Sequence, residues 1–213
     1  MASFISRARK FARQIIWYET LAADAIHREA WRMEDVALRV RKARRDDARE
    51  IARIYIESWH DTYASILPSA LLCAMTARGQ TARWRSAIIA KGREAVIVAD
   101  CPARGIVGMA SFGPSRDRDL AFDGEIYTLY VDPMFFGCGT GRALFAGCFE
   151  TMRAWDYASC VVWAHAKNPA RFFYEKMGGR LIAERTVRMM GDAVPESGFG
   201  WKKIESAVQS PAR

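Results

Sequence analysis

The residues best suited to chemistry lie between Glu125 and Leu144, in the sequence EIYTLYVDPMFFGCGTGRAL. A strand-like run leads into a loop that holds Gly137, Gly139 and Gly141, and an amphipathic helix follows. Glycine lets backbone N–H groups turn toward a bound anion, and the N-terminus of a helix carries about half a positive charge. This arrangement predicts a site for a pyrophosphate group.

Two common nucleotide-binding motifs do not fit this loop. A dinucleotide fold needs G-x-G-x-x-G, but the third glycine position after Gly137 and Gly139 is Arg142. The acidic ribose ligand expected about 20 residues further on is missing, and the P-loop pattern G-x-x-x-x-G-K-S/T is absent. The loop therefore either binds pyrophosphate in another way or only connects a strand to a helix.

A second segment, VWAHAKNPARFFYEKMGGR, has the pattern of a short helix. Asn168 can cap this helix and Pro169 suits its first position, whereas Gly178 and Gly179 are typical of a helix end. The phenol of Tyr174 is suited to donating a proton. The same side chain could instead pack with its aromatic neighbours.

The two segments together resemble the GNAT superfamily of N-acetyltransferases, over about residues 36–205. In that family an R/Q-x-x-G-x-G/A loop binds the pyrophosphate of coenzyme A, and the later helix flanks the pantetheine arm. The resemblance implies acetyl-CoA as the acyl donor, without a metal, and backbone N–H groups of residues 138–142 as pyrophosphate ligands. The residues that it implies for cofactor binding are Leu129, Tyr130, Val131, Phe136, Gly137, Cys138, Gly139, Thr140, Gly141, Arg142, Asn168 and Phe173.

The chain departs from the family pattern at two positions. Phe136 stands where the family usually has Gln or Arg, so we expect weaker binding of coenzyme A rather than none. Gly179 stands where a bulky apolar residue is usual, which should affect core packing more than chemistry. The first departure keeps open an alternative function, that of a non-catalytic acyl-CoA-binding or regulatory module.

Acyl transfer to an amine needs a base, because a lysine-like amine has a pKa near 10.4 and must lose a proton before it attacks. Glu125 opens its strand as the catalytic glutamate does in some family members, and it could act through a water, although it could also be an exposed acid at the strand end. A strand N–H can stabilise the oxyanion, and Tyr174 matches the tyrosine acid of the family. We expect a primary amine to attack directly in a ternary complex, with Glu125 and Tyr174 as the catalytic residues.

The segment IESWHDTYASILP resembles the substrate-side helix and loop of the family. Trp59 and Tyr63 are the predicted substrate-binding residues, and packing is the favoured alternative for Trp59. His60 and His165 are weaker candidates for a base. The sequence does not separate a small-molecule amine from a peptide N-terminus or a protein lysine.

The elements that position these residues predict a mixed α/β fold (an α+β mixed sheet) in a single acyl-CoA-binding domain. The expected strands are 37–42, 95–99, 106–112, 125–131, 160–164, 180–190 and 199–204. The expected helices are 46–59, a stretch opening at Pro68, 81–90, 139–155 and 169–177. The sequence Arg78–Gly79–Gln80 is expected to separate two of these helices, and the strands 95–99 and 106–112 to form a hairpin.

The domain boundaries that we expect are a basic helical N-terminal extension at 1–33, the N-acetyltransferase domain at 34–206 and a disordered tail at 207–213. The role of the extension stays open between a targeting segment and an upstream addition. No apolar stretch approaches the roughly 20 residues that span a bilayer, so we expect no membrane partner. Homodimerisation is left open.

The formal net charge of +8 permits an anionic partner, but no aromatic and basic stripe supports nucleic-acid binding, which we do not expect. The five cysteines are an odd number without a regular framework, which argues against a secreted disulfide-bonded domain. No CxxC occurs and the three histidines are far apart in the sequence, so no zinc site is expected. These features favour the reducing cytoplasm.

Overall fold

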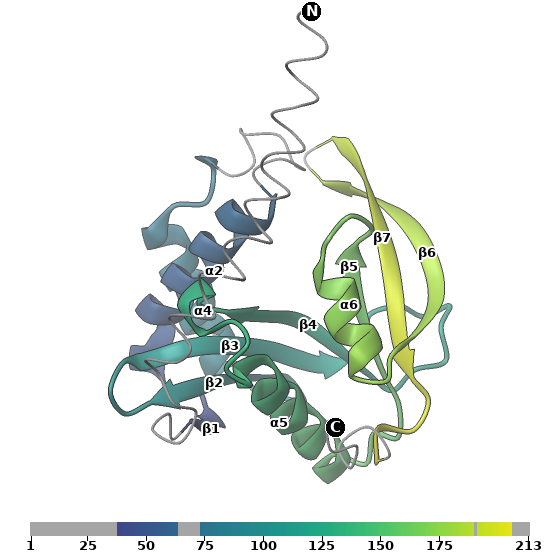
Figure 1. Cartoon of the computed structure of the whole chain (residues 1–213), viewed down its shortest axis with the longest axis horizontal. Helices are drawn as coiled ribbons and strands as arrows, with labels where there is room; N and C mark the ends of the chain where they lie inside the picture. The colour runs from purple at the N-terminus through teal and green to yellow at the C-terminus, as the bar shows by residue number, and fades with distance from the viewer. Residues whose placement is uncertain (1–37, 64–72, 190, 206–213) are drawn as a thin grey trace, which may run out of the picture. The chain divides into compact units, whose positions relative to one another are not determined.

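The computed structural model describes residues 38–63, 73–189 and 191–205. The predicted N-terminal extension, the predicted helical stretch opening at Pro68 and the predicted C-terminal tail lie outside these residues. Within the described part, seven strands form one sheet in the order β1-β2-β3-β4-β5-β7-β6 (Figure 1). This mixed sheet with its helices confirms the predicted fold class.

The strands are β1 (Arg39–Lys42), β2 (Ala95–Cys101), β3 (Gly105–Pro114), β4 (Gly124–Val131), β5 (Cys160–His165), β6 (Arg180–Met189) and β7 (Asp192–Trp201). The helices are α2 (Ala48–Tyr63), α4 (Ala77–Ile89), α5 (Thr140–Ala154) and α6 (Ala170–Lys176). Neighbouring strands are antiparallel except β4 and β5, which run parallel. The predicted hairpin is the antiparallel pair of β2 and β3.

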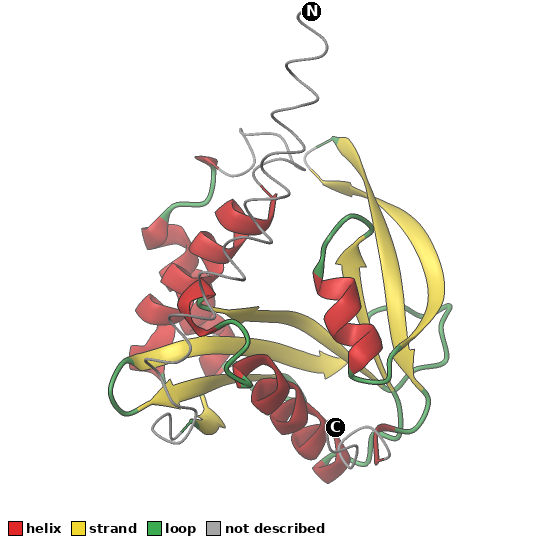
Figure 2. Cartoon of the chain, viewed as in Figure 1, coloured by secondary structure: helices red, strands yellow, loops and turns green. Residues whose placement is uncertain are grey.

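Helices cover both faces of the part of the sheet formed by β1 to β4 (Figure 2). Val96 and Val98 of β2 belong to a core cluster with residues of α2 and α4, whereas Ile97 between them lies against Gly147 of α5. Successive side chains of a strand point to opposite faces. Helices α2 and α4 therefore cover one face, and α5 covers the other.

β4 and β5 pair only briefly, over the three residues from Gly124 to Ile126 on β4. Beyond this seam β4 continues to Val131 beside β3, whereas β5 continues to His165 beside β7, and the two strands diverge (Figure 1). Among the residues that the structure describes, the β4 backbone at 127–131 has no strand partner on its β5 side. This open edge is the feature of the fold that positions the candidate site.

The structure corrects the predicted start of α4. Arg78–Gly79–Gln80, which we expected to separate two helices, lies in the first turn of this one helix. The side chain of Thr76 caps the helix, because its hydroxyl accepts the backbone N–H of Gly79 at 3.1 Å. The first N–H groups of a helix need such an acceptor, and this cap outweighs the low helix propensity of glycine.

The predicted last strand, 199–204, is also wrong in its extent, since β7 runs from Asp192 to Trp201. Pro195, Gly198 and Gly200 lower its apparent strand propensity. The two glycines leave room for aromatic rings. A Cβ at Gly198 would come within 2.9 Å of the Trp163 ring, and one at Gly200 within 2.6 Å of the Phe122 ring.

The unusual Gly179 has a packing explanation. A Cβ at this position would lie 2.5 Å from the ring of Trp201 and 2.9 Å from the carbonyl oxygen of Tyr174. The Trp201 indole is fixed in this place, because its Nε1 donates to the carbonyl of Met177 at 2.9 Å. The prediction that Gly179 bears on core packing is confirmed.

Candidate active site

The glycine loop presents backbone donors at the start of α5. Gly137 and Gly139 have φ angles of +78° and +81°, in the left-handed region that favours glycine. The first bond of the helix runs from the N–H of Ala143 to the carbonyl of Gly139 at 2.9 Å. Among the described residues, the N–H groups of residues 139–142 have no hydrogen-bond acceptor. Free backbone donors and a helix N-terminus are the groups with which proteins commonly bind anions.

Cys138 differs from the other loop residues that were predicted to bind the pyrophosphate through their backbone. The N–H of Cys138 donates to the carbonyl of Phe135 at 3.4 Å, whereas the N–H groups of residues 139–142 have no acceptor among the described residues. The side chain of Thr140 is buried toward β3, since its methyl group lies 3.2 Å from the Cβ position of Gly108. Thr140 therefore offers its backbone rather than its hydroxyl to a ligand.

Arg142 and Phe136 differ in what their side chains offer. Arg142 is partly exposed, and the described part of the chain contains no acidic partner for its guanidinium. This cation is available to a phosphate. Phe136 is 45% exposed and has no polar group, which agrees with the expected loss of a side-chain contact at this position.

The predicted cofactor residues of β4 and α6 lie close to this loop. A Cβ built at Gly141 would lie 3.8 Å from the side chain of Val131 and 3.5 Å from the ring of Phe173. Leu129 and Tyr130 precede Val131 on the open edge of β4. The structure therefore brings the loop, the open edge and Phe173 together around the start of α5.

Tyr174 lies on the next position of α6 and is 5% exposed. Its ring is 5.5 Å from that of Phe173 and 5.8 Å from that of Phe199. Burial raises the pKa of the Tyr174 phenol above its ordinary value of 10.0. The phenol therefore stays protonated at neutral pH, as a proton donor must.

Asn168 was predicted to bind the cofactor and Tyr63 the acceptor, and the two side chains are hydrogen-bonded to each other. The Asn168 Oδ1 accepts the N–H of Ala170 at 2.9 Å, which confirms the predicted cap of α6. The Asn168 Nδ2 donates to the hydroxyl of Tyr63 at 3.0 Å, and both side chains are buried. The amide of Asn168 thus links the last residue of α2 to the start of α6.

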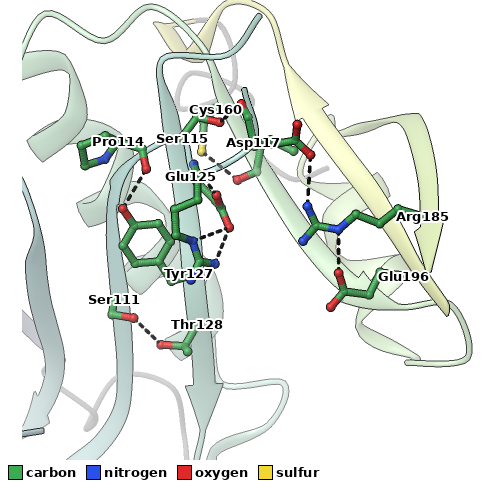
Figure 3. Close-up of polar contacts among 12 residues, drawn as sticks. Ser111, Pro114, Ser115, Asp117, Glu125, Tyr127, Thr128, Cys160, Arg185 and Glu196 are labelled. Atoms are coloured by element: carbon green, nitrogen blue, oxygen red, sulfur yellow. Dashed lines mark hydrogen bonds and ion pairs between the residues drawn. The ribbon is translucent and has the colours of Figure 1, made fainter. Parts of the chain in front are cut away.

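Glu125, the predicted base, is an ion-paired and buried residue rather than an exposed acid at the strand end. The side chain is 1% exposed, and Oε2 accepts the backbone N–H of Arg116 at 2.9 Å. Oε1 accepts Nε of Arg116 at 3.1 Å and also a guanidinium N–H of the same residue. Figure 3 shows these contacts beside Tyr127, whose ring centroid lies 4.1 Å from the Arg116 guanidinium.

Sequence reasoning missed Arg116. The residue lies in the polar loop between β3 and β4, close to Arg118, and neither residue has a local pattern that would single it out. The signal that could have found it is chemical: a buried carboxylate needs a cation or several donors.

Removing the Arg116 side chain tests this ion pair. We expect Arg116→Ala to lower the free energy of unfolding by about 1–3 kcal/mol, because Glu125 remains as a buried charge with fewer donors. For a domain of this size the Tm should fall by roughly 2–12 °C, measured by calorimetry. Arg118→Ala removes the same charge from an exposed position of the loop and serves as the control. An equal Tm for both variants would contradict the dependence of Glu125 on Arg116.

A cavity of about 340 Å³ lies on the side of the sheet that faces α2 and α4. Trp59 and Tyr63 contribute to its wall, with their ring centroids 4.9 Å apart. His60 is exposed and does not belong to the lining among the described residues. The structure therefore places both predicted substrate residues at one cavity and leaves His60 outside it.

His165 also lines the cavity, but its hydrogen bond makes it a poor base. Its Nδ1 accepts the backbone N–H of Lys167 at 3.0 Å, so the neutral ring carries its proton on Nε2. Burial, together with the charge of Lys167, lowers the pKa of His165 below its ordinary value of 6.5. The ring is therefore a neutral N–H donor at neutral pH.

This lowered pKa predicts a pH dependence of stability. Because the folded protein holds His165 neutral, the unfolded chain binds more protons and the protein loses stability as the pH falls from about 6.5 through the folded-state pKa. In His165→Gln we expect a smaller fall of Tm between pH 7.5 and 5.5. The pKa values of Asp47 and Asp123 are lowered from 3.8. The contributions of these two carboxylates to stability are therefore lost below about pH 4, outside the pH range of the His165 effect. The same fall in both proteins would contradict the prediction.

Comparison with known proteins agrees with this geometry. Residues 92–178 match the acetyltransferase (GNAT) domain family. The Bacillus subtilis (strain 168) protein YuaI, described as an uncharacterized N-acetyltransferase, is 30% identical over 167 residues, which cover 78% of this chain and 94% of that protein. The chain belongs to the GNAT family of acetyltransferases. This GNAT assignment confirms the family predicted from the two sequence segments.

Solved structures share the GNAT fold. The PaiA N-acetyltransferase from Thermoplasma acidophilum, in complex with coenzyme A, is 19% identical with a TM-score of 0.60, and the match covers 75% of this chain and 98% of that one. The YncA protein from Salmonella typhimurium, a putative acetyltransferase with acetyl-CoA, is 20% identical with a TM-score of 0.60, over 79% and 94% of the two chains. At these identities the likeness establishes the fold.

Three further features of this GNAT chain concern metal ions, membranes and cysteines. In the described residues no group of three or more His, Cys, Asp or Glu side chains is arranged to hold a metal ion. The helices that can be described are too short or too polar to cross a membrane. All five cysteines are free.

Proposed function

We propose that the chain transfers an acetyl group from acetyl-CoA to a primary amine, by direct attack in a ternary complex. One observation carries this proposal: the free N–H groups at the start of α5 lie beside the open edge of β4, and a cavity lies against the same strand. Tyr130 connects the open edge to the cavity, because its backbone is part of the edge and the residue also lines the cavity. A donor and an acceptor could therefore meet at β4.

The residues present fit coenzyme A. The N–H groups of residues 139–142 and the guanidinium of Arg142 would hold the pyrophosphate, as donors and a cation suit an anion. The backbone of residues 129–131 would pair with the pantetheine arm, with Phe173 against it. Asn168 has one amide hydrogen left for this arm, since the other is donated to Tyr63. When bound, acetyl-CoA supplies the thioester from which the acetyl group is transferred.

The chain's own residues would move the protons. Glu125 is the candidate base, and it would remove the proton of the amine through a water once the contact with Arg116 loosens. A free N–H of the β4 edge would donate to the thioester oxygen on which negative charge develops. Tyr174 would give its proton to the leaving sulfur, because its buried phenol is protonated at neutral pH.

One observation favours a second candidate function. The carboxylate of Glu125 is fully engaged by Arg116, so the protein as it stands could bind acyl-CoA without a free base. A regulatory or acyl-CoA-sensing module would have this arrangement. Turnover separates the two candidates, because a sensor would bind acetyl-CoA and release no coenzyme A with any amine.

The first test is a thermal shift of the full chain with acetyl-CoA, with NAD and ATP as comparison ligands. At about 100 times its Kd, a ligand stabilises the folded state by roughly 2.7 kcal/mol. For a chain of this size the Tm should rise by about 5–11 °C. A rise with acetyl-CoA alone, followed by release of coenzyme A with an amine, supports the enzyme. No rise in a folded sample would contradict both candidates, and a rise without turnover would favour the sensor.

A further inference from the structure

The cavity beside β4 has the size and walls of a small-molecule site. Its volume of about 340 Å³ lies at the lower end of the range for small ligands, so a folded protein surface is a poor match. Its walls combine aromatic rings with polar and charged side chains. The aromatic residues that line it are Tyr55, Trp59, Tyr63, Trp84, Phe112, Tyr127, Tyr130 and Trp163.

Two of the charged residues that line this cavity, Arg116 and Glu196, have ion-pair partners. Arg116 is bound to Glu125. Arg185, which stacks on the Trp163 ring at 3.7 Å from its centroid, is bound to Asp117 at 3.1 Å and to Glu196 at 2.8 Å (Figure 3). Arg116 and Glu125 cancel each other, whereas Arg185 is shared by two carboxylates, so that cluster keeps one formal negative charge although each carboxylate has a cationic partner.

Arg83 is different, because its guanidinium lines the cavity without a carboxylate partner among the described residues. Within the part of the chain that the structure describes, its Nη1 makes two long contacts, to the hydroxyl of Tyr55 at 3.4 Å and to Oε1 of Gln80 at 3.5 Å, and its other N–H groups have no acceptor.

The Arg83 guanidinium is also held in place. Its central carbon lies 5.5 Å from the centroid of the Tyr55 ring and 5.3 Å from that of the Trp84 ring. Contact with two aromatic faces restricts a long side chain, so less freedom is lost when a ligand binds. A planar guanidinium with free donors matches a carboxylate, which it can bind through two parallel hydrogen bonds.

The ion pairing of the carboxylates around the cavity also disfavours a polyamine as the ligand. A polycation would need several unpaired carboxylates, but Glu196 is bound to Arg185 and Glu125 to Arg116. Glu94 is the exception among the carboxylates of the lining, since it is exposed and has no ion pair within the described residues. One unpaired cation and one unpaired carboxylate suit a ligand that itself carries one charge of each sign.

We infer that the acceptor is a small amine that also carries a carboxylate, and that Arg83 binds this carboxylate within the cavity. This inference rests on the proposed acetyltransferase function and narrows its substrate class. Arg83 acts as a specificity-determining residue, because it contacts the acceptor at a group that does not react.

The test compares amines that differ only in the carboxylate. Release of coenzyme A by the full chain is measured with free amino acids, with the same amino acids as C-terminal amides, and with spermidine. We expect kcat/KM for the acids to exceed that for the amides by about tenfold to a hundredfold. This ratio is the gain expected from one charge-assisted hydrogen-bonded contact between Arg83 and the carboxylate. In Arg83→Gln this ratio should fall to about one, with the acetyl-CoA thermal shift unchanged.

Arg85→Gln is the matched control, since it removes the same charge from the same helix at an exposed residue outside the cavity lining. It should keep the preference for the acids. Equal or better activity of the wild type on amides or spermidine would overturn the inference, and so would an Arg83→Gln variant that keeps the preference.

A second readout does not need turnover. N-acetyl amino acids and their amides, which are the expected products, are titrated into the protein saturated with coenzyme A. Tighter binding of the acids, lost in Arg83→Gln, supports the inference, and equal binding of acids and amides overturns it. If the protein shows this binding preference but releases coenzyme A with none of the amines, the proposed transfer reaction is overturned and the assignment of Arg83 remains.

Discussion

Replacing Gly139 with valine is expected to abolish the binding of acetyl-CoA. Gly139 has a φ of +81°, and a β-branched residue there is strained by roughly 1–3 kcal/mol whatever the free space. The loop can relieve this strain only by rotating the backbone that aims the N–H groups of residues 139–142. Isothermal titration with acetyl-CoA should detect no binding at concentrations that saturate the wild type.

Two variants separate this effect from general damage to the fold. Gly105→Val introduces a similar strain at a φ of +76° at the first residue of β3, where a Cβ meets no atom within 4 Å. Gly141→Ala changes the same loop at a position where φ is not positive and the new Cβ is in ordinary contact with Phe173. Both should retain binding. Wild-type affinity in Gly139→Val would show that the pyrophosphate is bound elsewhere.

Tyr174→Phe is expected to lower kcat by about a hundredfold or more while the Kd for acetyl-CoA changes little. The variant keeps the ring that packs between Phe173 and Phe199 and removes only the proton donor. Because burial raises the pKa of this phenol, the wild type should keep its donor up to at least pH 10. The measurement is the steady-state rate of coenzyme A release with any accepted amine.

Tyr157→Phe is the control for this substitution, since it removes a phenol outside both the loop and the cavity lining. It should turn over at the wild-type rate. Equal rates for Tyr174→Phe and the wild type would mean that the sulfur leaves without a proton from Tyr174.

The parts of the site that depend on local sequence could be predicted. The glycine spacing of the loop specifies its left-handed residues, and the i, i+4 spacing of Leu144 and Cys148 specifies the buried face of α5, because both patterns act within a few residues. The cap of α6 by Asn168 is of the same kind. These features can therefore be predicted from a few neighbouring residues, without the rest of the chain.

The parts that depend on distant segments could not be predicted. The bond between Asn168 and Tyr63 joins residues 105 positions apart, and the contact between Arg53 and Asp132 joins residues 79 positions apart. The divergence of β4 and β5 also leaves no local trace, because each strand alone is a normal apolar run. That Arg83 has no carboxylate partner among the described residues likewise depends on the positions of distant side chains.

The short seam between β4 and β5 joins two parts of the sheet, β1–β4 and β5–β7–β6. In the described part of the chain three strand pairs, from Gly124 to Ile126, connect these parts, and the hydrogen bond between Asn168 and Tyr63 and the packing of Trp201 on Phe145 and Phe149 add further contacts. Amide hydrogen exchange should therefore show separate opening of the two parts. A ligand that lies along the open edge of β4 and against α6 contacts both parts, so it should slow exchange in β5 and β7 more than in β2.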